Sequence, residues 1–261
     1  MKTKDVRSSL YDIPPQVRRT DAIQAFDSME FPLVEIEDQD GLIGVGFSYT
    51  IGKGGRAIKQ IIDQYLIPIV LQEDPNNIDR IWRRMWMETH WVGRGGIVGL
   101  GIAAIDIALW DLKAKRANLP LYQLLGGAKS EVPVYNTDGG WLHLTEDELV
   151  RQSVEFIEQG FKGIKIKVGR DSLHEDISRI SVVRGAIGEE PFLMIDANMK
   201  WNAREAIQLA SRIEEYDIFW FEEPIEADDV TSHVELRSKT TIPIAIGSPN
   251  QNQINNCCVT W

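Results

Sequence analysis

The sequence predicts an α/β fold in which an α+β segment precedes a run of strand–helix units. Strand patterns alternate with amphipathic helix patterns four times between residues about 130 and 247, which is typical of a parallel sheet. Residues up to about 127 lack this alternation and combine a hairpin pattern with longer helical patterns. We therefore divide the chain into an α+β segment at 1–127, a parallel α/β segment at 128–247 and a tail at 248–261.

The first segment opens with a hairpin. Two strand patterns, at 32–37 and 42–47, flank the turn sequence Asp-Gln-Asp-Gly, and such polar, glycine-containing turns join antiparallel strands. Apolar residues then recur at helical spacing. The helices predicted on this basis cover about 55–72, 78–88 and 97–117. Pro120 ends the last of them, because proline cannot continue a helix.

The second segment alternates regularly. Strands are predicted at 132–136, 163–169, 192–198, 218–224 and 242–247, and helices at about 146–159, 173–187, 203–215 and 227–238. Two parallel architectures remain open at this point, an open doubly wound sheet and a (β/α) barrel. A barrel places functional residues at the C-terminal ends of successive strands.

Composition excludes several classes of function. The 261 residues are 43% hydrophobic, and the net charge of −11 argues against nucleic acid and anionic membranes as partners. The sequence shows neither an apolar run of membrane-spanning length nor a signal peptide. The only cysteines, Cys257 and Cys258, are adjacent, which supports neither a disulfide framework nor a zinc site. We expect a cytoplasmic protein.

The strand at 163–169 carries two lysines on one face. Ile164, Ile166 and Val168 point to one side, and Lys165 and Lys167 point to the other, because strand side chains alternate. An unpaired buried charge is costly, so an anionic group should meet the ammonium groups, either a protein carboxylate or a substrate. The alternative is an exposed edge strand whose lysines face solvent.

Polar residues also end the next two strands. Asp196 and Asn198 share one face, and Glu222 follows one strand–helix unit later. Residues at equivalent positions on adjacent parallel strands converge in space. The alternative is that Asp196 and Glu222 cap the helices that follow. By alternation, Glu223 should point away from the site.

Such a cluster suits a divalent metal. Hard oxygen ligands favour Mg²⁺, and two ammonium groups near a divalent cation lower each other's pKa. A neutral lysine can act as a general base. The combination suits abstraction of a proton α to a carboxylate, with the developing negative charge stabilised by the metal.

Several segments resemble the enolase superfamily, in its mandelate racemase and muconate lactonizing enzyme family. These are 103–115 with 120–127, Lys165-Ile166-Lys167, Asp196-Ala197-Asn198 and Glu222-Glu223-Pro224. The resemblance implies an α+β capping domain followed by a TIM-type (β/α) barrel, and one essential Mg²⁺. It implies that Lys167 is the base, that Lys165 assists it and contacts the substrate carboxylate, that Asn198 contacts substrate oxygen, and that Asp196 and Glu222 are metal ligands.

Within the family, the segments 43–47, 135–137 and 139–143 are most similar to acid-sugar dehydratases of the galactarate/talarate type. The resemblance thus implies a small acid-sugar carboxylate as substrate, with a racemase or epimerase as the alternative reaction, and allows a homo-oligomer. Arg18, Arg19 and Lys53 could bind a distal carboxylate, although exposed basic residues are common.

The sequence departs from the family near its end. The third acidic ligand is expected at the position of Ser248, and the tail from 249 to 261 is rich in Asn and Gln. We therefore expect a truncated, incomplete barrel of about five strands with impaired catalysis. Two other hypotheses remain: a Schiff-base aldolase using Lys165 or Lys167, which leaves Asp196 and Glu222 unexplained, and a non-catalytic interaction module.

Overall fold

The computed structural model describes residues 2–93 and 95–247. Contacts divide the chain into two units. The first comprises the residues up to Gln16 together with Phe26–Glu131, and the second comprises Val17–Ala25 together with the residues from Val132 onward. Each unit has its own cluster of buried apolar side chains. The predicted site residues at 165–222 all belong to the second unit.

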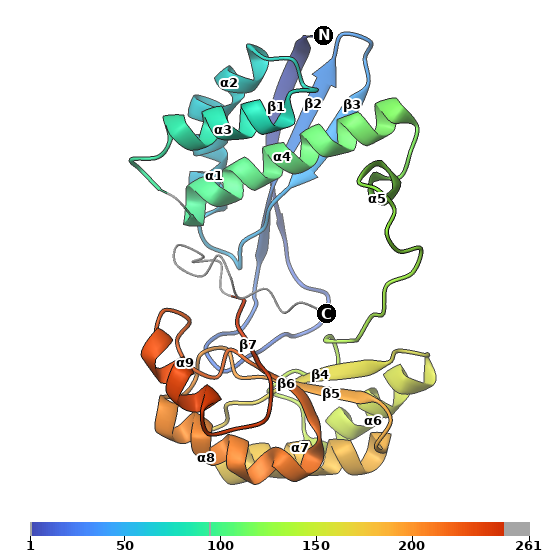
Figure 1. Ribbon diagram of the computed structural model, residues 1–261, viewed down its shortest axis with the longest axis vertical. Helices are drawn as coiled ribbons and strands as arrows, with labels where there is room; N and C mark the ends of the chain where they lie inside the picture. Colours follow the sequence, from blue (N-terminus) through green and yellow to red (C-terminus); the bar gives the residue numbers. More distant parts are fainter. Residues whose placement is uncertain (1, 94, 248–261) are drawn as a thin grey trace. The chain divides into compact units, whose positions relative to one another are not determined.

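The sheet of the first unit has three antiparallel strands in the order β1-β2-β3 (Figure 1). Strands β2 (Met29–Asp38) and β3 (Ile43–Phe47) form the predicted hairpin. Strand β1 (Thr3–Ile13) pairs with β2 along its length and was not predicted. Val6 is the one apolar side chain of β1 that is buried, so the period-2 pattern that marks a half-buried strand is too weak to detect.

Helices α1–α4 cover one face of this sheet (Figure 1). The predicted helix at 55–72 is realised as α1 (Gly55–Ile61), a π-helical turn (Ile62–Leu66) and α2 (Ile67–Leu71). Helices α3 (Ile78–Glu88) and α4 (Gly96–Ala117) lie where they were predicted, and the short α5 (Leu121–Leu124) follows. A Cβ on Gly46 would lie 2.1 Å from the carbonyl oxygen of Ala104. The glycine therefore permits α4 to pack directly on β3.

The second unit is built on a parallel sheet in the order β4-β5-β6-β7. Its strands are β4 (Gly163–Lys167), β5 (Phe192–Asp196), β6 (Ile218–Glu222) and β7 (Ile244–Ala245). Its helices are α6 (Glu146–Glu158), α7 (Leu173–Ile187), α8 (Ala203–Ile213), the 3₁₀ turn Glu214–Tyr216 and α9 (Val230–Arg237).

Strand order decides between the two parallel architectures. The strands follow one another in sequence order, and α6–α9 lie on one side of the sheet (Figure 1). A doubly wound sheet would reverse its strand order and carry helices on both faces. The unit is therefore a segment of a TIM-type (β/α) barrel, with its helices on the outside.

The predicted strand at 132–136 is wrong. In the described structure this stretch makes a single parallel bridge, between Asn136 and Ile164, and Val132 and Val134 are 72% and 60% exposed. Pro133 has no N–H to donate to a sheet, which disfavours pairing here. The parallel sheet in the described part of the chain thus has four strands rather than about five.

The apolar face of β4 packs as predicted. Ile164, Ile166 and Val168 are buried in the core of the second unit, so Lys165 and Lys167 project from the opposite face of the sheet. Among the described residues, no helix has the length and apolar character needed to cross a membrane.

Candidate active site

The site forms where three neighbouring strands end. In the parallel register, Lys167 of β4 lies beside Asp196 of β5, and Asp196 lies beside Glu222 of β6. Because all three strands run in the same direction, their C-terminal residues meet at one edge of the sheet. The structure therefore brings together the side chains that the sequence predicted to converge.

The Lys165 ammonium bridges the two carboxylates. Its Nζ lies 2.8 Å from both carboxylate oxygens of Glu222 and 3.3 Å from Oδ2 of Asp196. The indole Nε1 of Trp220 donates a further hydrogen bond to Oε2 of Glu222 at 3.1 Å. One cation is thus held by three oxygens from two strands.

Lys167 makes a different set of contacts. Its Nζ lies 2.6 Å from Oδ2 of Asp196 and 2.8 Å from the side-chain oxygen of Asn198. The backbone N–H of Asn198 donates to Oδ1 of Asp196 at 3.0 Å. Asp196 therefore forms ion pairs with both lysines and accepts hydrogen bonds from Lys167 and from the backbone that follows it, which fixes the orientation of its carboxylate.

These contacts settle which groups meet the lysines. The side chains of Lys165 and Lys167 are only 11% and 12% exposed, and Asp196 is 3% exposed, so the solvated edge-strand alternative is wrong. Burial lowers the pKa of Lys165, but the charges of Asp196 and Glu222 outweigh it, and the pKa lies above its usual value. The two carboxylates thus stabilise the charged form of Lys165.

The backbone is strained where these strands end. Asn198, Met199 and Glu223 have φ angles of 46°, 62° and 42°, a left-handed conformation that non-glycine residues rarely adopt. Such strain persists only where the surrounding structure enforces it, and it is common at functional sites. It follows β5 and β6 directly, at the ends that carry Asp196 and Glu222.

Glu223 directly follows the predicted metal ligand Glu222 in the sequence. It is 8% exposed. Burial raises its pKa, and the nearby charges of Asp196 and Glu222 raise it further. Its left-handed backbone interrupts the strict alternation of a strand.

An aromatic side chain, which sequence reasoning gave no role, lies beside Lys167. The Trp141 ring centroid is 5.9 Å from the Lys167 Nζ and 5.7 Å from the Arg19 guanidinium carbon. The neighbouring Gly140 lies against β4, since a Cβ there would be 2.3 Å from the carbonyl oxygen of Lys165. The adjacent glycines 139 and 140 were the available sequence signal for this close approach.

The segment Val17–Ala25 contacts the loop that carries Trp141. The Thr20 side chain hydrogen-bonds the ring nitrogen Nδ1 of His143 at 2.9 Å, and Arg19 lies 3.1 Å from the Asp138 carboxylate. Burial lowers the pKa of His143, and the charge of Arg18 lowers it further. Arg18 and Arg19 therefore belong to the unit that carries the site, whereas Lys53 belongs to the other unit.

A buried carboxylate supports the end of β4. Asp176 is fully buried and accepts hydrogen bonds from the backbone N–H groups of Gly169 and Arg170 at 3.0–3.3 Å. Arg170 and Arg179 both donate to the carbonyl oxygen of Leu144. The network ties the end of β4 to the loop that carries Trp141.

The donor set fits a divalent cation with two protein carboxylates. Asp196 and Glu222 present oxygens to one cationic position, which the Lys165 ammonium takes. Mg²⁺ is often held by one or two carboxylates together with water and substrate oxygens. No group of three or more His, Cys, Asp or Glu residues suited to a metal is found in the described part of the chain. The predicted third position, Ser248, lies outside the described residues.

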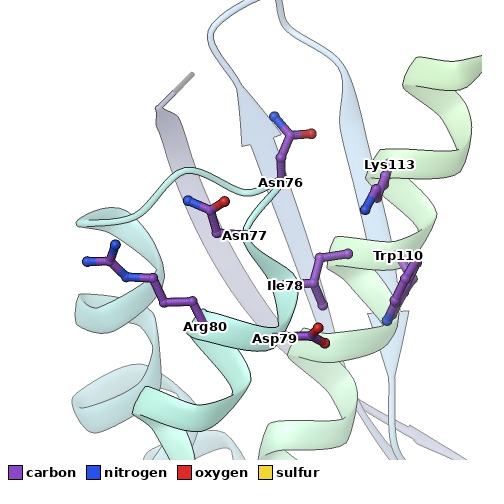
Figure 2. Close-up of a pocket in the computed structure, with 7 residues that line it drawn as sticks. All are labelled: Asn76, Asn77, Ile78, Asp79, Arg80, Trp110 and Lys113. Carbon is purple, nitrogen blue, oxygen red and sulfur yellow. The ribbon is translucent and has the colours of Figure 1, made fainter.

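A separate pocket lies in the first unit. It is a cavity of about 370 Å³ between the start of α3 and one face of α4, and Figure 2 shows its lining side chains. Trp110 and Lys113 line it from α4, and the residues 76–80 line it from α3 and the turn before it. It contains none of the predicted site residues.

Two family models match the chain. The model described as "Mandelate racemase / muconate lactonizing enzyme, N-terminal domain" matches residues 10–126. The model described as "Enolase C-terminal domain-like" matches residues 148–252. The second match includes every residue of the predicted site.

Two characterised relatives are similar over most of the chain. The 3,6-anhydro-alpha-L-galactonate cycloisomerase of Streptomyces coelicolor is 42% identical over 243 residues, which are 93% of this chain and 67% of that protein. The L-talarate/galactarate dehydratase of Salmonella typhimurium is 43% identical over 219 residues, which are 82% of this chain and 54% of that protein. The chain thus spans about half to two thirds of the length of these relatives.

Two solved structures are similar to this chain in fold and in sequence. The L-talarate/galactarate dehydratase of Salmonella typhimurium, liganded with Mg and L-lyxarohydroxamate, superposes with a TM-score of 0.90 at 39% identity, covering 95% of this chain and 64% of that one. A racemase from Streptomyces coelicolor with bound magnesium gives a TM-score of 0.91 at 40% identity, covering 95% and 70%.

Proposed function

Because the chain belongs to the mandelate racemase and muconate lactonizing enzyme family of the enolase superfamily, we propose that it abstracts a proton α to a carboxylate of an acid sugar. The relatives are dehydratases and cycloisomerases, so the lineage is enzymatic. Dehydration of an aldarate or aldonate is the reaction we favour, since the similar dehydratases act on such acids by name.

One observation carries the proposal, the convergence of two lysines and two carboxylates at adjoining strand ends. Lys167 Nζ would take the α-proton, Lys165 would hold the substrate carboxylate, and Asn198 would contact a substrate oxygen. Asp196 and Glu222 would hold Mg²⁺. When bound, Mg²⁺ would stabilise the negative charge that develops on the substrate carboxylate as the proton leaves. The Trp141 ring restricts the space around Lys167.

We expect turnover by this chain alone to be slow. The described residues supply two carboxylates to the cation, whereas the resemblance implies three, and fewer charged ligands bind a divalent cation more weakly. A substrate carboxylate oriented by a weakly held cation loses part of the stabilisation that the reaction needs.

Proton exchange tests the proposal directly. The chain is incubated in D₂O with Mg²⁺ and a panel of acid sugars that includes galactarate, L-talarate and arabinonate, and the α-proton signal is followed by NMR. We expect exchange that requires Mg²⁺ and falls by about 10²-fold or more in Lys167→Met, the usual contribution of a general base. The control is Lys200→Met. The Lys200 ammonium pairs with the exposed carboxylate of Asp171, at 3.8 Å, rather than with a carboxylate of the site. Absence of exchange with every acid would contradict the proposal.

A second reaction is favoured by the relatives. A cycloisomerase is 42% identical to this chain, and a structure named as a racemase is 40% identical. Both dehydration and isomerisation can begin with loss of the α-proton. The product separates dehydration from racemisation, because dehydration yields a keto acid that reacts with semicarbazide and a racemase yields the epimer of its substrate.

A further inference from the structure

We propose that the Lys165 ammonium and a divalent cation compete for the same two carboxylates, so that loading the cation releases the Lys165 side chain. The inference rests on the function proposed above, because it takes Asp196 and Glu222 as the cation ligands. It goes beyond that function by giving Lys165 a separate role in the cation-free protein.

The contacts of Lys165 define the competition. Both oxygens of Glu222 accept from its Nζ at 2.8 Å, and Oδ2 of Asp196 lies 3.3 Å away. A cation that binds both carboxylates needs these same oxygens. Two cations drawn to one pair of carboxylates also repel each other strongly at such short range. The ammonium must therefore leave the oxygens that the metal takes.

Burial explains why a cation is needed here at all times. The side chains of Asp196 and Glu222 are 3% and 22% exposed, and they lie side by side on neighbouring strands. Two partly buried carboxylates without a counter-charge repel each other and lose their hydration. Lys167 pairs with Asp196 alone, whereas Lys165 supplies charge to both carboxylates, and a divalent cation would replace Lys165 on loading.

Lys167 is the matched comparison. It also pairs with Asp196, at 2.6 Å, but its second contact is the neutral side chain of Asn198 rather than Glu222. Removing either lysine deletes one positive charge near the same carboxylates. Either removal takes an ion pair from Asp196, but only removal of Lys165 takes the ion pair from Glu222, which keeps its hydrogen bond from Trp220.

The consequence for catalysis is a sequence of binding steps, in which the cation is loaded before Lys165 meets the substrate. Once released, Lys165 points from the same face of β4 with no carboxylate holding it, and it becomes available to the carboxylate of a substrate. Cation loading would therefore prepare Lys165 for substrate, while Lys167 keeps its contact with Asn198.

Calorimetric Mg²⁺ titration of the full chain is the first test, with the parent, Lys165→Met, Lys167→Met and Lys200→Met compared under one buffer condition. We expect Lys165→Met to bind Mg²⁺ about tenfold more tightly than Lys167→Met, the equivalent of one charge-assisted hydrogen bond. Lys200→Met should bind as the parent does, since its charge lies outside the carboxylate pair.

Amine footprinting keeps the test informative if Lys165→Met does not fold. The parent is acetylated briefly in chelator and in saturating Mg²⁺, and the modification at each lysine is measured by mass spectrometry. We expect Mg²⁺ to increase acetylation of Lys165 several-fold and to leave Lys200 unchanged.

The outcomes separate the two proposals. If the parent binds Mg²⁺ but Lys165→Met binds it no more tightly than Lys167→Met, the proposed competition is wrong while the proposed function stands. The same holds if Mg²⁺ does not change the acetylation of Lys165. If neither the parent nor any variant binds Mg²⁺, the competition and the proposed function both fail.

Discussion

Lys165 and Lys167 are two residues apart on β4, yet their ammonium groups have different partners. Lys165 contacts two carboxylates from two strands, and Lys167 contacts one carboxylate and one amide oxygen. The difference arises because successive positions along a parallel strand face different points of the neighbouring strands. It suits the distinct parts proposed for the two lysines in the reaction, Lys165 holding the substrate carboxylate and Lys167 acting as base.

Asp176 carries a prediction about pH. Burial raises its pKa to about 6, although backbone hydrogen bonds from Gly169 and Arg170 and the charge of Arg179 oppose the rise. The folded state therefore binds this proton more tightly than the unfolded chain does. Protonation favours the fold, so the contribution of Asp176 to stability falls as the pH rises from about 4 to about 6.

The variant Asp176→Asn does not titrate at this position. Relative to the parent, its free energy of unfolding should improve by about 2 to 3 kcal/mol between pH 4 and pH 6. Urea unfolding of both proteins at pH 4, 5, 6 and 7 measures the difference. A difference that stays constant across this range would show that the Asp176 pKa is not raised in the fold.

At the scale of elements, the site depends on how closely a loop approaches β4. Gly140 packs its backbone on Lys165 and Ile166, and its carbonyl oxygen accepts from the N–H of Lys167 at 2.7 Å. The loop with Gly140 and Trp141 thus occupies the edge of β4 that a further strand would take. The single bridge between Asn136 and Ile164 continues the same edge.

Gly140→Ala tests this packing. The added Cβ would lie 2.3 Å from the Lys165 carbonyl oxygen and 2.6 Å from the Ile166 Cα, and these backbone atoms cannot move without displacing β4. We expect a loss of about 1 to 3 kcal/mol in the free energy of unfolding, measured by urea unfolding.

The control is Gly185→Ala in α7, where an added Cβ meets nothing within 4 Å. There alanine should be neutral or stabilising by up to about 1 kcal/mol, because glycine is the poorer helix former. Equal effects of the two substitutions would mean that the approach of Gly140 to β4 does not constrain the strand.

At the scale of the whole molecule, the chain contains two units with separate apolar cores that share no residue. We propose that they correspond to the capping and barrel domains at 1–127 and 128–247. The segment Val17–Ala25 is grouped with the second unit although its neighbours in sequence belong to the first. Cytoplasmic location and homo-oligomerisation stay predictions at this scale.

Limited proteolysis checks the division. Residues 126–135 form neither helix nor strand, and all of them are exposed. Trypsin should therefore cleave first at Lys129, since proteases prefer exposed segments without regular structure. Mass spectrometry of the earliest fragments identifies the site. First cleavage within α7 or β4 would contradict the existence of two compact units joined at this stretch.

The sequence by itself determined most of the order of elements and which side chains would meet at the strand ends. Alternating apolar residues placed Ile164 and Ile166 in the core, and strand periodicity put Lys165, Lys167, Asp196 and Glu222 at equivalent strand ends. These inferences succeed because helix and strand periods are local properties of the chain.

The tertiary structure alone decided what local patterns do not encode. It showed that residues 132–136, predicted as a strand, form only one bridge, and that Trp141 lies beside Lys167. It also showed that the Lys165 ammonium links the carboxylates of Asp196 and Glu222. It also decided between the barrel and the doubly wound sheet through strand order. Each of these depends on contacts between residues distant in sequence, and their geometry follows from packing of the whole unit rather than from spacing along the chain.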